Sequence, residues 1–259
     1  DRALLFLGET GTGKEYIAQA IHQKSSKKNL PFIKLNCSSR PAHEINSILF
    51  PSTKQTAGSK TKAIKAPLTT PQVVYLDNVD ALNQTIQKKL FNSLNPTKTK
   101  EQNLLPSRLY ISSSKNLNTL ATQNLFNQDL LSIFSNSTIS VPSLRENRTT
   151  IPVLIRNHLE KVSQKDGLPI PEVDSIALEA LCEYHWPENI RELHSVLDRI
   201  LATAPSRKKI SINQIPQEIR KSKAQQAKIK PNKGNSFQQR TLKRSVVLYG
   251  SGLHKGLKT

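Results

Sequence analysis

The chain has 259 residues, of which 36% are hydrophobic, so it is long enough to bury one large core or two smaller ones. No segment approaches the roughly 18 consecutive apolar residues of a membrane-spanning helix, and we therefore expect a soluble protein without a membrane span. The formal net charge of +19 is uneven, because residues 205–259 carry +13 and residues 1–204 carry only +6.

An apolar run at the start of the chain leads into a glycine-rich turn and then into a helical pattern. Ala3–Leu7 predicts a strand and Lys14–Gln23 a helix, and the turn between them, called the P-loop below, reads Gly8, Glu9, Thr10, Gly11, Thr12, Gly13, Lys14, Glu15. Such a turn brings backbone N–H groups together on a polyphosphate at a helix N-terminus, where the helix dipole also favours negative charge. We expect a nucleotide-binding site with Lys14 on the outer phosphates, rather than an ordinary glycine-rich turn. Glu15 stands where the general motif places a hydroxyl on Mg²⁺.

Further apolar runs of strand length alternate with helical patterns. Strands are expected at Phe32–Leu35, Val73–Leu76, Leu109–Ile111 and Thr138–Val141, and helices at Gln84–Leu94 and Asn127–Phe134. This alternation predicts an α/β fold, with a parallel sheet covered by helices on both faces.

After Pro142 no further strand is expected. Helical patterns follow at Ile151–Val162, Asp174–Tyr184 and Asn189–Ala202, with Asp174 as an N-cap, and they predict a small helical domain. Two polar stretches lack such periodicity. Residues 51–70 predict a long loop, and residues 204–236 a charged linker with one amphipathic patch at 212–219.

Four segments, taken in order, resemble a known family. The P-loop resembles the sequence GESGTGKE, including Glu15, and the other matches are Pro31–Cys37, Pro142–Glu146 and Trp186–Leu193. Together they resemble the AAA+ ATPase domain of bacterial sigma-54-dependent transcription activators, also called enhancer-binding proteins. The resemblance covers residues 1 to about 218 and implies ATP and Mg²⁺ as ligands. It also implies a homo-oligomeric ring in which turnover drives a loop against sigma-54 RNA polymerase.

The resemblance divides the chain into four parts. Residues 1–144 are expected to form the AAA+ nucleotide-binding domain and residues 145–218 its helical lid. Residues 219–238 are expected to be a basic linker, and residues 239–259 the beginning of another domain.

The resemblance also implies roles for residues outside the P-loop. Asp77, at the end of an apolar strand, is expected to hold Mg²⁺ beside the phosphates. Arg191 matches a sensor arginine that would contact the γ-phosphate, the alternative being an ordinary surface arginine.

Several positions depart from the family pattern. The water-activating Glu is replaced by Asn78, and a polar sensor Asn by Ser114. Two arginines that the family supplies across the subunit interface are replaced by Asn127 and Ile133. The family's GAFTGA loop is replaced by residues 51–60 without its Phe-Thr pair. We therefore expect impaired ATP hydrolysis and a weak or absent sigma-54 contact.

The end of the chain carries a second resemblance. Residues 239–256 are similar to the first strand and turn of the zinc-dependent UDP-3-O-acyl-N-acetylglucosamine deacetylase of lipid A synthesis. The run ends before any metal ligand, so this fragment alone cannot catalyse that reaction. A chance match over so short a segment is the alternative.

Three hypotheses follow from these patterns. The first is an ATP-binding AAA+ module of a transcription regulator, and the second an inert tether at the start of a fusion to the deacetylase. The third is nucleic-acid binding through the basic tail, against the simpler interpretation of that tail as a solvated linker. Cys37 and Cys182 lack disulfide or metal spacing, which predicts reduced thiols in a cytoplasmic protein.

Overall fold

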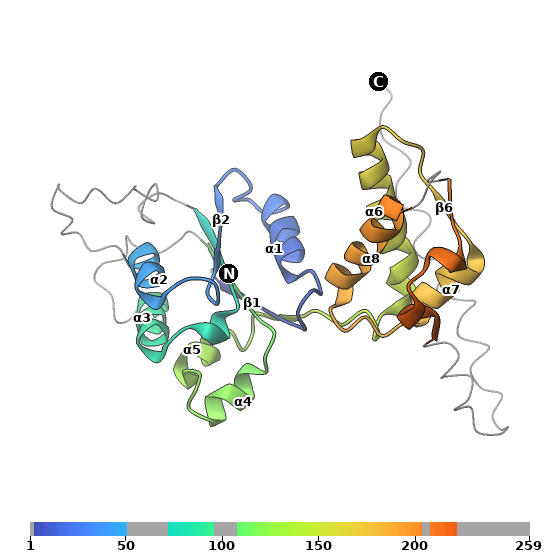
Figure 1. The fold of residues 1–259 in the computed structure, drawn as a ribbon. Helices are drawn as coiled ribbons and strands as arrows, with labels where there is room; N and C mark the ends of the chain where they lie inside the picture. The colour runs from blue at the N-terminus through green and yellow to red at the C-terminus, as the bar shows by residue number, and fades with distance from the viewer. Residues whose placement is uncertain (1–2, 51–71, 96–107, 204–207, 222–259) are drawn as a thin grey trace.

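A parallel sheet of five strands forms one half of the molecule (Figure 1). The computed structural model describes residues 3–50, 72–95, 108–203 and 208–221. The strands follow the order β2-β3-β4-β1-β5 across the sheet, and each neighbouring pair runs parallel. Their bounds are β1 (Ala3–Leu7), β2 (Phe32–Asn36), β3 (Val73–Asp77), β4 (Arg108–Ser113) and β5 (Thr138–Ser140). This topology confirms the predicted α/β fold and all five predicted strands of the sheet.

Alternating side chains on the two central strands bury both faces of the sheet. Tyr75 and Tyr110 pack with Phe6 and with Ala18 of helix α1 (Lys14–Gln23), which covers one face. The opposite face carries the larger core, formed with four other helices. These are α2 (Ala42–Leu49), α3 (Gln84–Leu94), α4 (Leu117–Thr122) and α5 (Gln128–Ile133). A parallel sheet needs this double cover because its strands are apolar on both sides.

Helices α1 and α3 have the predicted bounds, whereas α5 is shorter than the predicted Asn127–Phe134. Asn127 lies before α5 as its N-cap and accepts a hydrogen bond from the Leu130 backbone N–H at 2.7 Å. Helices α2 and α4 were not predicted, because eight and six residues give too few turns for a helical period to stand out.

A second hydrophobic core lies in the helical domain, defined here as residues 145–221 (Figure 1). Trp186, Leu159 and Leu197 are fully buried in it. Its helices are α6 (Ile151–Asp166), α7 (Ser175–Glu183) and α8 (Asn189–Thr203), with the 3-10 turns η2 (Arg148–Thr150) and η3 (Ile212–Gln214). The three predicted helices are therefore present, with shifted ends.

The expectation that strands end after Pro142 was wrong. β6 (Glu172–Val173) and β7 (Lys209–Ile210) pair in parallel as a small second sheet, and two-residue strands are too short to show a period in the sequence. Asp174 occupies the predicted N-cap of α7 without a side-chain capping bond. Ile219 is buried in the core of the helical domain, one residue beyond the boundary expected at 218.

Several predictions concern residues outside the described part of the chain. These are the loop at 51–70, most of the basic linker and the deacetylase-like segment 239–259. Among the described residues, no helix has the length and apolarity to cross a membrane.

Candidate functional site

The P-loop connects β1 to α1 at the carboxyl edge of the sheet. Gly13 precedes α1 with φ of 86°, a left-handed conformation that favours glycine, and it provides no side-chain cap to the first turn. The Thr12 hydroxyl donates to the Glu9 carbonyl at 2.9 Å and closes the loop from within. An uncapped helix start behind a closed glycine turn is the geometry of a phosphate cradle.

Lys14 is the central cation of this loop. Its ammonium group donates to the carbonyl oxygens of Gly8 at 2.7 Å and Glu9 at 2.8 Å, and the residue is only 7% exposed. Burial lowers the pKa of Lys14, and the Asp77 carboxylate is the largest influence opposing that shift. The lysine charge is thus held inside the loop, where a bound phosphate would replace the two carbonyls as its partner.

Asp77 ends β3 at the same edge of the sheet. Its Oδ1 accepts hydrogen bonds from the Ser112 hydroxyl at 2.6 Å and from the Tyr75 hydroxyl at 3.4 Å. Both bonds recorded among the described residues end on Oδ1, which leaves Oδ2 for a ligand. Burial and the charges of Asp77 and Asp80 raise the pKa of the nearby Cys37 thiol to about 12, so this thiol stays protonated and inert.

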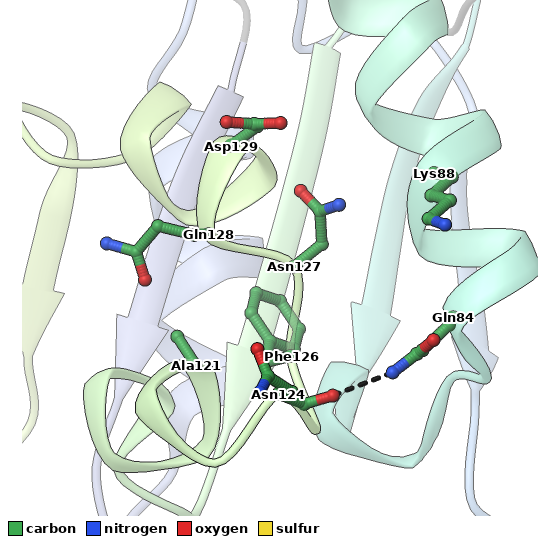
Figure 2. A pocket seen from close by; sticks show the side chains of 8 residues that line it. All are labelled: Gln84, Lys88, Ala121, Asn124, Phe126, Asn127, Gln128 and Asp129. Carbon is green, nitrogen blue, oxygen red and sulfur yellow. Dashed lines mark hydrogen bonds between the residues drawn. The ribbon is translucent and has the colours of Figure 1, made fainter.

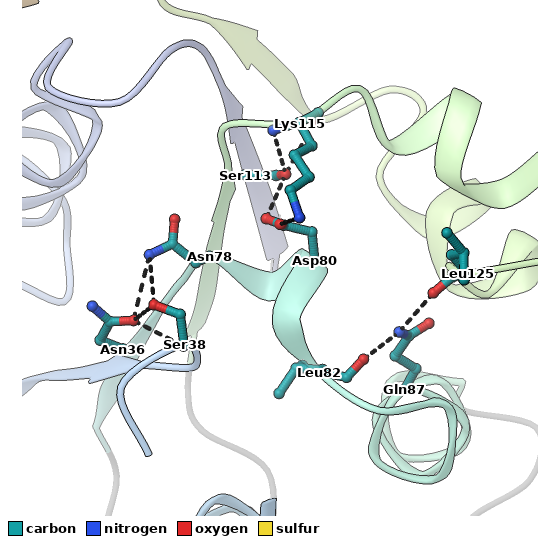
Figure 3. Close-up of polar contacts among 9 residues, drawn as sticks. All are labelled: Asn36, Ser38, Asn78, Asp80, Leu82, Gln87, Ser113, Lys115 and Leu125. Atoms are coloured by element: carbon teal, nitrogen blue, oxygen red, sulfur yellow. Dashed lines mark hydrogen bonds and ion pairs between the residues drawn. The ribbon is translucent and has the colours of Figure 1, made fainter. Parts of the chain in front are cut away.

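Asn78 follows Asp77 along the chain, and its side chain lies beside Asn36 and Ser38, at the end of β2 (Figure 3). Its side-chain amide donates to Asn36 Oδ1 and to Ser38 Oγ, both at 3.4 Å. Its φ of 56° lies in the left-handed region, which asparagine tolerates better than most residues. An amide in this position donates hydrogen bonds but cannot remove a proton from water.

A second carboxylate, not identified from the sequence, lies beyond Asn78 (Figure 3). The Asp80 side chain is 5% exposed, accepts from the Ser113 hydroxyl at 2.8 Å and pairs with Lys115 at 3.2 Å. The Ser113 carbonyl in turn accepts the Gly8 backbone N–H at 3.3 Å. Ser112 and Ser113 therefore tie Asp77 and Asp80 to the end of β4. Two serines ending an otherwise apolar strand were the only signal of this in the sequence.

The structure brings Arg191, on α8, to the P-loop. A Cβ added at Gly11 would lie 3.2 Å from Arg191 Cβ, and the Arg191 charge contributes to lowering the pKa of Lys14. The side chains of Glu9 and Glu15, two residues predicted to bind nucleotide with the P-loop, pair with other residues of the protein. Glu9 pairs with Arg145, and Glu15 pairs with Lys34 of β2.

The positions that depart from the family pattern at α5 lie in a different region. Asn127 caps α5, and Ile133 packs against the core of the sheet domain. The buried Gln87 of α3 accepts the Asn127 backbone N–H at 2.7 Å and donates to the Leu82 carbonyl at 2.6 Å (Figure 3).

A cavity of about 370 Å³ opens between α3 and the α4–α5 segment (Figure 2). Gln84 donates across it to the Asn124 carbonyl at 2.7 Å. None of the residues predicted to bind nucleotide lines it. The lining residues are Gln84, Lys88, Ala121, Asn124, Phe126, Asn127, Gln128 and Asp129. Within the described ranges, no group of three or more His, Cys, Asp or Glu side chains is arranged to hold a metal ion.

Two family models match the chain. The sigma-54 interaction domain matches residues 1–140, and the AAA+ ATPase lid domain matches residues 145–232. The boundary between them falls in the connection between the sheet domain and the helical domain.

Curated relatives agree with these matches. The chain is 32% identical to the DNA-binding transcriptional regulator NtrC of a Bradyrhizobium strain, over 79% of the chain and 44% of that protein. It is 32% identical to the Nif-specific regulatory protein of Azotobacter vinelandii, over 76% of the chain and 39% of that protein. It is also 30% identical to a Pseudomonas protein described as lying in the HyuA 5′ region, over 86% of the chain and 77% of that protein. The chain thus spans less than half the length of the two named regulators.

Solved structures share the fold. NtrX from Brucella abortus, solved with ATP, superposes with a TM-score of 0.70 at 23% identity, over 95% of this chain and 54% of that one. The same protein solved with ADP gives a TM-score of 0.70 at 22% identity.

Proposed function

This chain belongs to the family of sigma-54 interaction domains of AAA+ type, and we propose that it binds ATP with Mg²⁺ at the P-loop and hydrolyses it poorly. The observation that carries the proposal is the placement of Lys14 inside a closed glycine loop, with the Asp77 carboxylate at the same edge of the sheet. A triphosphate needs these two groups together, a cation for its outer oxygens and a carboxylate for its metal.

Each predicted binding residue has a role in this proposal. The backbone N–H groups of residues 9–15 cradle the phosphates, while Gly8 and Glu9 provide the two carbonyl partners that Lys14 exchanges for phosphate oxygens. Asp77 holds Mg²⁺ or its waters through the oxygen that Ser112 does not occupy. Arg191 approaches from α8 as a second cation. The magnesium ion, when bound, neutralises charge on the phosphates.

Slow hydrolysis is the second part of the proposal. Water attack on the γ-phosphate needs a group that orients and polarises the water, and Asn78 offers only an amide that is already bonded to Asn36 and Ser38. At α5, Asn127 and Ile133 supply no positive charge to a neighbouring subunit. We therefore propose a nucleotide-binding module that retains ATP and assembles as a homo-oligomeric ring, with a weak or absent sigma-54 contact.

A nucleotide titration tests the proposal. Calorimetry of the full chain with ATP and Mg²⁺ is expected to show binding, and Lys14→Ala is expected to weaken it at least tenfold, since it removes the main phosphate cation. Lys24→Ala is the matched control, because Lys24 is an exposed lysine at the far end of the same helix. Circular dichroism of each variant checks that the fold is retained.

Two outcomes would contradict the proposal. Absence of heat on titrating the unmodified chain with ATP and Mg²⁺ would contradict the proposal that the P-loop binds nucleotide. Phosphate release at about 1 s⁻¹ or faster, which lies within the usual range of enzyme turnover rates, would contradict the proposal of slow hydrolysis.

A further inference from the structure

Glu9, the second residue of the P-loop, points to the helical domain. Its Oε2 accepts the Arg145 guanidinium Nη1–H at 2.7 Å, while Oε1 accepts the second Arg145 nitrogen in a two-pronged pair. Its Oε2 also accepts the Asn189 side-chain amide at 3.2 Å. These bonds lower the pKa of Glu9, with Arg145 as the first cause and Asn189 as the second. The carboxylate therefore stays ionised and occupied by the protein.

Asn189, the first residue of α8, joins three segments. Its Oδ1 accepts the Leu144 backbone N–H at 2.9 Å, and its amide donates to the Thr10 carbonyl at 3.0 Å as well as to Glu9. The residue is fully buried and has φ of 54°. A buried side chain with three hydrogen bonds, in a backbone conformation that costs energy for most residues, is fixed by its surroundings.

The backbone of the P-loop also contacts the start of α8. The Ile190 backbone N–H donates to the Gly11 carbonyl at 3.0 Å. A Cβ added at Gly11, which has φ of 78°, would lie 2.0 Å from the Glu188 carbonyl oxygen, so only glycine allows this approach. The next residue along α8, Arg191, is the cation predicted to reach the phosphates.

We propose that Glu9 latches the helical domain onto the P-loop, and that Arg145 and Asn189 are positioning residues that hold Arg191 at the nucleotide site. The inference rests on the proposed nucleotide binding for its ligand, and it assigns Glu9 a role other than contact with that ligand. An exposed ion pair by itself contributes little, and Glu9 and Arg145 are each 40% exposed. The two-pronged geometry and the buried Asn189 beside it distinguish this latch from an ordinary surface pair.

A latch of this kind couples ATP binding at the P-loop to the position of the helical domain. If the P-loop holds the helical domain in the position that favours ATP, then ATP in turn favours the latched position by the same factor. Loosening the latch should weaken ATP binding without removing any phosphate contact, and should also loosen the helical domain in the absence of nucleotide.

The test is Arg145→Gln in the full chain, with two measurements. Hydrogen exchange of the Leu144 and Ile190 amides, which the latch orders, is expected to accelerate with or without nucleotide. The Kd for ATP is expected to rise about fivefold, the lower end of typical coupling between sites because the pair is half exposed. Arg145→Lys keeps the positive charge but cannot form the two-pronged pair with Glu9. Its exchange rates and its Kd for ATP are expected to lie between those of the unmodified chain and Arg145→Gln.

Arg156→Gln is the matched control. It removes an arginine from the exposed Arg156–Glu160 pair of α6, at 2.7 Å, which has no contact with the P-loop among the described residues. The control is expected to change neither measurement. Unchanged exchange at Leu144 and Ile190 in Arg145→Gln overturns the latch, and so does faster exchange with an unchanged Kd. If the unmodified chain binds no ATP while Arg145→Gln still exchanges faster, the proposed function fails but the latching contact stands.

Discussion

Asn78 occupies a backbone position that suits asparagine and lies where hydrolysis would need a carboxylate. Its φ of 56° costs a longer side chain about 1 kcal/mol. Its amide binds the oxygens of Asn36 and Ser38, which a glutamate would repel unless one partner rotated. At the residue scale, the local hydrogen bonding is thus adapted to an amide.

Replacing Asn78 tests whether water activation is the missing step. Asn78→Glu combined with Ile133→Arg restores the water-activating carboxylate and one of the interface arginines of the family pattern. We expect ATP turnover to rise by about a hundredfold, the usual contribution of a positioned base. The measurement is phosphate release at saturating ATP and at a protein concentration high enough for subunits to meet.

The control separates charge from size. Asn78→Gln with Ile133→Arg has the same length as the glutamate variant but no carboxylate, and is expected to remain as slow as the unmodified chain. Equal turnover in the two double variants would contradict the argument, because the gain would then not come from a base.

Single residues differ in how far the sequence alone could place them. Lys14 and Asp77 lie within local motifs, so their positions at one sheet edge follow from strand order and were predicted. Glu9 was predicted as part of the nucleotide site, but the partners of its carboxylate, Arg145 and Asn189, lie more than 130 residues away and were not predicted. Asp80 depends in the same way on Ser113 and Lys115. Partners brought together by folding leave no local pattern to read.

At the scale of elements, α6 and α8 meet through two histidines. The rings of His158 and His194 stack at 4.1 Å between centroids, and His158 Nε2 lies 2.7 Å from an Asp198 carboxylate oxygen. Burial, then His158 and more weakly Lys161, lower the pKa of His194, while Asp198 opposes the shift. A positive charge on the half-buried His194 would therefore work against the packing of the two helices.

The sign of the resulting pH dependence follows from that shift. The unfolded chain binds a proton at His194 with a pKa of about 6.5, and the folded chain resists protonation, so stability is full above that pH. It is lost as the pH falls through the lower pKa of the folded state. We expect the melting temperature of the helical domain to fall between pH 7.5 and pH 5.5, and His194→Gln to remove most of this dependence.

Tryptophan fluorescence during thermal unfolding measures this effect. His185→Gln is the control, because His185 is an exposed histidine of the same domain and its loss should leave the pH dependence in place. A His194→Gln protein that still loses stability over this interval would show that other groups are responsible.

Elements were predictable where a helical period extended over several turns or where an apolar run had the length of a strand. The five strands of the sheet and the helices α1, α3, α6, α7 and α8 meet that condition. The short elements do not, because their formation depends on what they pack against. β6 and β7 lie directly before α7 and η3, two elements that contact each other. Helix α2 covers the sheet through the buried Ile45 and Leu49.

At the scale of the whole molecule, two domains with separate hydrophobic cores meet at the P-loop. The core of the sheet domain and that of the helical domain share no residue. The bonds that join them include those of Glu9, Thr10 and Gly11 to Arg145 and to the start of α8. Whether the two domains unfold together therefore depends on contacts that surround the proposed nucleotide site.

Trp186 is the only tryptophan of the chain and reports on one of these cores. It is fully buried in the helical domain, donates to the Leu181 carbonyl at 2.8 Å and meets Tyr184 edge-on at 5.0 Å. Its fluorescence follows the helical domain, whereas circular dichroism follows both domains. The two signals together show whether ligand binding at the P-loop stabilises the distant core.

We expect ATP with Mg²⁺ at a hundred times its Kd to stabilise the chain by about 2.7 kcal/mol. Because the latch couples the domains, the fluorescence transition should rise by about 5–10 °C together with the transition seen by circular dichroism. Lys14→Ala should abolish both shifts, and Arg145→Gln should reduce the fluorescence shift more than the dichroism shift, since it leaves the phosphate contacts in the sheet domain. A dichroism transition that rises while the fluorescence transition of the unmodified chain stays fixed would mean that the two cores unfold independently, and that the contacts at Glu9 and Asn189 carry no coupling between them.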